Sequence, residues 1–113
     1  MTAILYGSMV RGEATAISDV DILIIADHDT IADLDLYRLP PQVSPYVVEK
    51  HKLREMAYTN SVVIAAILEG ILLVDNLRIM DELAELKKEI AASGGEVTHR
   101  QIRYPRPNRN IPA

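Results

Sequence analysis

The segment from Asp19 to Ala26, which reads DVDILIIA, constrains the fold more than any other part of the chain. It begins with two acidic residues and then continues with consecutive apolar ones, so a strand formed by it would be apolar on both faces. Such a strand is typical of the centre of a sheet that is covered by helices, and not of an exposed edge. We therefore predict a central strand over residues 19–26 and helices packed on its sheet.

The pattern of apolar residues predicts further strands and helices on both sides of this segment. The other extended segments are expected at residues 2–6, 43–49 and 71–74. Helices are expected at residues 8–15, 52–58, 61–69 and 78–92, with a short one inside the segment 27–39. The alternation of strands and helices indicates an α/β (α+β) domain, with a small mixed β-sheet flanked by helices.

The segment 61–69 is apolar almost all round, which predicts either deep burial or an oligomer interface. Asn60 is placed to cap this helix, and Gly70 is expected to end it in a left-handed conformation. Because burial and self-association both explain the pattern, a homo-oligomer remains open.

Composition and length limit the class of protein. A chain of 113 residues forms one domain. It has no cysteine, which excludes disulfides and thiolate metal sites. No signal-peptide pattern is present, and the longest apolar stretch, Val62 to Val74, is interrupted and too short to span a bilayer. We therefore expect a soluble cytoplasmic protein without a membrane partner.

Charge is distributed unevenly along the chain. Residues 1–36 carry seven acidic residues against one basic residue, Arg11, whereas residues 98–113 carry four arginines and no acid. This asymmetry predicts a cation-binding region near the N-terminus and an anion-binding tail, although two solvated surfaces would explain it as well. We expect a domain over residues 1–97 and a basic, proline-rich, flexible tail over residues 98–113, with nucleic acid left open as a partner.

Asp19 and Asp21 have the spacing of a cation site. Side chains two apart on a strand project from one face, about 7 Å apart along the chain. Two like charges so close are unfavourable unless a cation joins them. Oxygen ligands suit Mg²⁺, which is commonly held by one or two carboxylates together with substrate phosphates. Asp19 and Asp21 are therefore predicted to bind metal.

The segment that begins with Gly7 and Ser8 is suited to bind phosphate. A glycine after a strand allows a sharp turn and a close approach by a phosphate group. Ser8 then opens a helix, where backbone N–H groups and a hydroxyl can bind phosphate oxygens, although it could also serve as a helix cap. Arg11 is a further candidate for phosphate binding, and an ion pair with Glu13 or Asp19 explains it equally well.

The sequence GSMVRGEATAISDVDILII resembles the signature of the minimal nucleotidyltransferases of the DNA polymerase β-like superfamily, G-S-x-x-R-G-E followed by S-D-x-D and an apolar strand. The resemblance covers Ala3 to Ile25 closely and Asn60 to Asp75 more loosely. It implies a nucleotidyltransferase-like fold and nucleotide binding by Gly7, Ser8 and Arg11. By the same resemblance, Asp19 and Asp21 would hold catalytic Mg²⁺, with room for a two-ion site.

The resemblance also implies a reaction. The chain would transfer a nucleoside monophosphate, with AMP from ATP as the expected case, to an acceptor hydroxyl. Many relatives are antitoxins encoded beside HEPN-domain toxins, and some transfer AMP onto that partner. A HEPN-type toxin is therefore the expected protein partner, and the acceptor hydroxyl would lie on it.

The chain departs from the family in the third carboxylate, which relatives carry on a later strand to activate the attacking hydroxyl. In residues 43–49 the expected acidic position falls on Ser44, and Glu49 is the nearest acid. Glu49 is therefore the candidate third catalytic residue, or else it begins the following helix. Without a third acid, the chain would be a catalytically impaired binding module that acts as an antitoxin. A phosphatase with an Asp-x-Asp nucleophile fits less well, because its acids end a strand.

Overall fold

The protein contains a four-stranded mixed sheet in the computed structural model, which describes residues 1–13, 19–35, 38–98 and 101–106. The sheet has the order β3-β2-β1-β4. β1 runs antiparallel to β2 and to β4, whereas β2 runs parallel to β3. The predicted segment 19–26 therefore lies between two neighbours, which confirms it as a central strand. The four strands are β1 (Thr2–Tyr6), β2 (Val20–Ala26), β3 (Val43–Glu49) and β4 (Ile71–Asp75).

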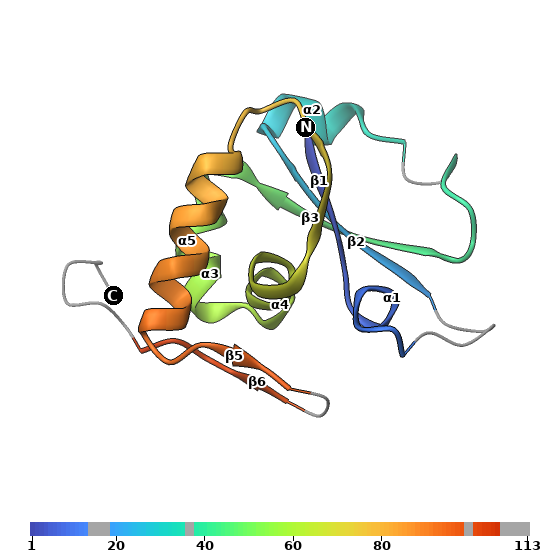
Figure 1. Ribbon diagram of the computed structural model, residues 1–113. Coiled ribbons are helices and arrows are strands. Elements are labelled where there is room, and N and C mark those ends of the chain that lie inside the picture. Colours follow the sequence, from blue (N-terminus) through green and yellow to red (C-terminus); the bar gives the residue numbers. More distant parts are fainter. Residues whose placement is uncertain (14–18, 36–37, 99–100, 107–113) are drawn as a thin grey trace.

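Helices cover one face of this sheet. Figure 1 shows α3, α4 and α5 together on that face, while α1 and α2 lie at opposite ends of the sheet. The predicted mixed sheet flanked by helices is thus confirmed. The first helix ends earlier than predicted, and positions 14 and 15 of that prediction lie outside the described residues. The helices are α1 (Ser8–Arg11), α2 (His28–Asp33), α3 (Leu53–Thr59), α4 (Ser61–Glu69) and α5 (Met80–Ala92), with a 3-10 turn over Lys50–Lys52 before α3.

The core lies between the sheet and these three helices. Leu23 and Ile25 project from β2 into a buried apolar cluster with Ile64 from α4 and Leu86 from α5. Ile24, on the other face of β2, is also buried, so apolar side chains on both faces of this strand are shielded from solvent. Residues 63–67 are buried, so α4 is a core helix, and this burial accounts for its apolar sequence. No helix in the described part of the chain is long and apolar enough to cross a membrane.

The two ends of α4 are determined by different interactions. At its start, the side-chain oxygen of Asn60 accepts hydrogen bonds from the N–H groups of Val62 and Val63, which confirms the predicted cap. At its end, the expected left-handed glycine is wrong, because Gly70 is extended at φ −70° and ψ 156°. A Cβ at Gly70 would instead collide with the carbonyl oxygen of Ala66 and with the side chain of Ile4. Glycine is therefore required at this position by close packing and not by a left-handed turn.

A short hairpin follows α5. Its strands are β5 (Glu96–Val97) and β6 (Ile102–Arg103), which pair antiparallel. The N–H of Arg106 donates to the carbonyl of Ser93 at 2.7 Å, and Pro105 is buried, so this segment is held against the end of α5. Of the predicted tail over 98–113, positions 99–100 and 107–113 lie outside the described residues.

Candidate active site

Gly7 brings the turn after β1 against the carboxylate of Asp21. Its φ is +83°, a conformation that side-chain-bearing residues rarely adopt. A Cβ at this position would lie 2.5 Å from Oδ2 of Asp21, closer than real Cβ contacts. Both observations require glycine here. The backbone of the loop therefore forms one wall of the space around the carboxylate.

Asp21 lies in an environment that disfavours its own charge. Burial raises the pKa of the Asp21 carboxyl above its ordinary value of 3.8, and the charge of Asp19 raises it further, while Arg11 acts in the opposite direction. Asp19 precedes β2 and is exposed. A cation between the two carboxylates would remove their repulsion, so the electrostatics of the pair favour a bound cation.

Tyr6 lies beside Asp21 and was not predicted as part of the site. Tyr6 is the register partner of Asp21 in the β1–β2 pairing. Burial, followed by the charge of Asp21 and the neighbouring Tyr46, raises the pKa of Tyr6 to about 12, so its hydroxyl stays protonated near neutral pH. The Tyr46 hydroxyl accepts a hydrogen bond from Nδ2 of Asn60 at 2.8 Å, which joins β3 to the start of α4. The signal that could have found Tyr6 is its place at the end of β1, opposite the start of the antiparallel strand β2.

The register of β3 locates both candidates for the third carboxylate. Ser44 is the partner of Asp21, so the position beside that aspartate holds a neutral hydroxyl. Glu49 is the partner of Ala26, five residues further along, which is roughly 16 Å at about 3.3 Å per residue. The structure therefore brings Asp19 and Asp21 together but does not bring Glu49 to them.

Glu49 has a different set of contacts. Its Oε1 lies 3.1 Å from Nδ1 of His28, and its Oε2 lies 3.3 Å from Nε2 of His51. The hydrogen bond with His28 lowers the pKa of the Glu49 carboxyl, and the charges of His51 and Lys52 lower it further. Both histidines are exposed. Glu49 therefore joins β3 to α2 and to the following 3-10 turn.

Arg11 connects the loop after β1 to α4. It forms the predicted ion pair with Glu13, with Nε and Oε2 separated by 3.3 Å. It also forms an unpredicted one with Glu69, with Nη1 and Oε1 separated by 2.6 Å. Ser8 is the first residue of α1, and the cap position belongs to Gly7, so the interpretation of Ser8 as the helix cap is wrong. Its hydroxyl thus has no capping role that would compete with a ligand.

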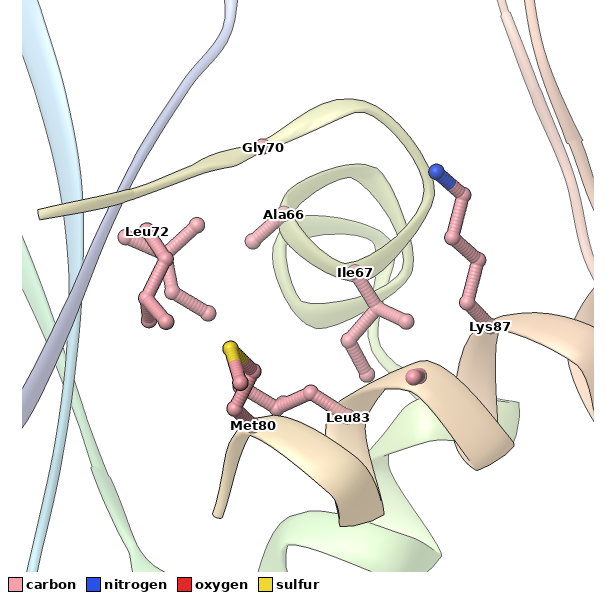
Figure 2. Close-up of a pocket in the computed structure, with 9 residues that line it drawn as sticks. Ala66, Ile67, Gly70, Leu72, Met80, Leu83 and Lys87 are labelled. Atoms are coloured by element: carbon pink, nitrogen blue, oxygen red, sulfur yellow. The ribbon is translucent and has the colours of Figure 1, made fainter. Parts of the chain in front are cut away.

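A mostly apolar cavity lies elsewhere in the molecule. Figure 2 shows it between α4, α5 and the strands β1 and β4, where Gly70, Leu72 and Met80 line it. Its volume is about 140 Å³, and Lys87 is the one charged residue among the described residues that line it. None of the predicted site residues lines it, and its apolar walls offer nothing to a phosphate or a metal ion.

The donor set at the aspartates suits a magnesium ion that shares its ligands with a substrate. Two carboxylates and substrate phosphates are a common set of ligands for Mg²⁺ in proteins. Among the residues that the structure describes, no group of three or more histidines or acids lies close enough together to hold a metal by itself. The residues therefore fit a metal that arrives with a nucleotide better than a permanently bound one.

A glycine turn packed against an acidic pair, at the start of a central strand in a mixed sheet, is the arrangement expected of a nucleotidyltransferase. The family model described as "Polymerase beta, Nucleotidyltransferase" matches residues 1–79, which is more than half of the chain, and the chain belongs to this family. No match was found among the curated proteins or among the solved structures. The family supports a general nucleotidyltransferase-type function with a nucleotide as substrate.

Proposed function

We propose that this protein transfers AMP from ATP to a hydroxyl group on a HEPN-type partner protein, in a reaction that depends on Mg²⁺. The observation that carries this proposal is the packing of Gly7 against Asp21, with Asp19 two residues away. This contact places the backbone of the turn, beside which a phosphate could lie, next to the two carboxylates that a phosphate-bound cation requires.

Each residue of the site has a specific role in this proposal. Asp19 and Asp21 would hold Mg²⁺, which supplies neutralisation of the charge on the phosphates. The turn at Gly7 would face the triphosphate, and the Ser8 hydroxyl would donate to one of its oxygens. The acceptor oxygen forms a bond to the α-phosphorus, the bond to the β-phosphate oxygen breaks, and pyrophosphate leaves while the hydroxyl proton passes to solvent. Catalysis then rests on positioning and electrostatic stabilisation.

A second function is favoured by Ser44. Its hydroxyl occupies the position beside Asp21, where an acid would activate the attacking group, and Glu49 is too distant to replace that acid. A chain with only two carboxylates would still bind a nucleotide with Mg²⁺ but would transfer it slowly or not at all. In that case the protein acts as a nucleotide-binding antitoxin that neutralises its partner by association.

The two functions are separated by labelled ATP. We would incubate the protein with Mg²⁺ and the products of neighbouring genes, using ATP labelled on the α-phosphate in one reaction and on the γ-phosphate in another. AMP transfer predicts label on the partner from the α-labelled ATP alone. Label from the γ-labelled ATP would contradict AMP transfer, and stable association without any label would favour the binding module.

Two variants make this experiment specific to the site. Asp21→Asn should abolish transfer, because an amide is a poor ligand for a hard cation. Glu49→Gln should leave transfer close to that of the wild type, because Glu49 lies at the far end of β3. Loss of transfer in Glu49→Gln, with nucleotide binding retained, would restore Glu49 as a catalytic residue.

A further inference from the structure

A second pocket lies between α1, the start of α4 and the β5–β6 hairpin. Its volume is about 320 Å³. Figure 1 shows α1 and the hairpin at the same end of the molecule, and the pocket lies where they approach α4. The hairpin begins at Glu96, beyond residues 1–79, so this wall lies outside the part of the chain that the family model matches. The lining residues are Arg11, Ser61, Val97, Thr98, Gln101, Ile102 and Tyr104.

The lining combines an aromatic ring with polar groups. Tyr104 is 51% exposed, and an exposed aromatic ring on a pocket wall provides a surface for stacking. Ile102 and Val97 add apolar area, whereas Gln101 carries an amide that can both donate and accept hydrogen bonds. Among the residues that the structure describes, no acidic one lines the pocket. These are the properties of a site for a flat, polar heterocycle, and the volume lies within the usual range for small-molecule pockets.

Hydrogen bonds close the turn of the hairpin and attach its C-terminal end to the end of α5. The N–H of Thr98 donates to the carbonyl of Gln101 at 2.9 Å, and the Thr98 hydroxyl donates to the same carbonyl at 3.0 Å. Beyond β6, the N–H of Arg106 donates to the carbonyl of Ser93. A wall whose own turn is closed and whose base is attached to α5 can position a ligand without first having to become ordered.

Arg11 connects this pocket to the aspartates. It lines the pocket, and it lies at the end of the four-residue helix that begins directly after Gly7. Gly7 in turn packs against the carboxylate of Asp21. A ligand that extends from the pocket past Arg11 would therefore reach toward Gly7 and Asp21.

We propose that this pocket binds the nucleoside of the nucleotide substrate, with the base stacked on Tyr104 and the phosphates directed past Arg11 toward Gly7 and Asp21. This inference rests on the proposed function, because it names the part of the site that receives the base. It assigns to the hairpin the role of a substrate-binding wall.

The test compares two ligands that share their phosphates and differ in the nucleoside. We would measure, by calorimetry with Mg²⁺, the affinity of the wild type for ATP and for inorganic tripolyphosphate. The inference predicts tighter binding of ATP. Tyr104→Ala should weaken ATP binding about tenfold, the size expected when one base loses its stacking partner. The affinity of this variant for tripolyphosphate should stay unchanged, and that result would also show that the variant is folded.

Two control variants separate stacking from other effects. Tyr104→Phe keeps the ring and should bind ATP like the wild type. Arg103→Ala removes a neighbouring side chain that does not line the pocket, so it should leave the ratio of the two affinities unchanged. Equal binding of both ligands by the wild type, or full ATP affinity in Tyr104→Ala, would overturn the inference but not the proposed function. A wild type that binds neither ligand would overturn both.

Discussion

The backbone of Gly7 packs against the carboxylate of Asp21 so closely that a Cβ on the glycine would lie 2.5 Å from Oδ2. Gly7 directly follows β1, whereas Asp21 lies in β2. The antiparallel pairing of β1 and β2 brings them together, because it places Tyr6 opposite Asp21. The loop and the acidic pair therefore form one site, whose parts can be tested separately.

Gly7→Ala tests the contact itself. The substitution forces a side chain into an unfavourable φ and against Asp21, so it should lower the free energy of unfolding by about 1–3 kcal/mol and abolish nucleotide binding. Gly12→Ala is the matched control, because Gly12 also has a positive φ, +73°, but has nothing within 4 Å of an added Cβ. Chemical denaturation should show a smaller loss for Gly12→Ala. Equal losses would mean that backbone strain alone accounts for the effect.

Asp21→Asn tests the electrostatic strain at the pair. Because the pKa of Asp21 is raised in the folded protein, the folded state binds the proton more tightly than the unfolded state does. Stability of the wild type should therefore fall, relative to Asp21→Asn, as the pH rises from the ordinary aspartate pKa through the raised one. At neutral pH, without metal, the variant should be at least as stable as the wild type.

Denaturation curves over a range of pH measure this difference. Asp19→Asn serves as the control, since removing the neighbouring charge should shift the pH dependence of the Asp21 effect to lower pH. A variant Asp21→Asn that is clearly less stable than the wild type at neutral pH would show that this carboxylate stabilises the fold.

Asn60→Ala tests the hydrogen bonds by which Asn60 caps α4 and connects it to β3. It removes the cap on Val62 and Val63 and the hydrogen bond to Tyr46, so thermal or chemical unfolding should show a loss of roughly 0.5–2 kcal/mol. Asn60→Asp keeps an oxygen that can cap the helix but cannot donate to Tyr46, and it should recover most of the loss. If the aspartate variant is as unstable as the alanine variant, the bond to Tyr46 matters more than the cap.

Local patterns were enough to predict the elements that frame the site. The run DVDILIIA predicted the central strand, and Asn60 before an apolar run predicted a capped helix, because both signals lie within a few neighbouring residues. The packing role of Gly70 could not be predicted in this way. A glycine after a helix can allow a left-handed turn or leave space for a neighbour, and here the neighbour is Ile4, which is distant in sequence.

Contacts between distant segments account for the other differences. The Arg11–Glu69 pair spans 58 residues, so nothing in the G-S-x-x-R-G-E segment indicates it. The remoteness of Glu49 from Asp21 depends on the register of β2 with β3, which the sequence of one strand does not determine. The hairpin was missed because its strands have only two residues each, too few for an alternating pattern.

Glu69→Gln tests whether Arg11 binds phosphate. If it does, releasing Arg11 from Glu69 should leave ATP affinity unchanged or raise it a few-fold, whereas Arg11→Gln should lower it about tenfold. Stability should change by no more than about 1 kcal/mol, since the pair is partly exposed. Glu89→Gln, which removes the ion pair with Arg54 on α3, should not affect ATP affinity. Unchanged ATP affinity in Arg11→Gln would restrict Arg11 to a structural role.

The most direct test of the account is the binding of ATP by the wild type and by Asp21→Asn, measured by calorimetry with Mg²⁺ and again with a chelator. The account predicts that the wild type binds ATP with Mg²⁺ and loses that binding with the chelator. It also predicts that Asp21→Asn, although folded, binds at least tenfold more weakly. Absence of ATP binding by the wild type, or equal affinity in Asp21→Asn, would contradict a nucleotide site built on Gly7 and Asp21.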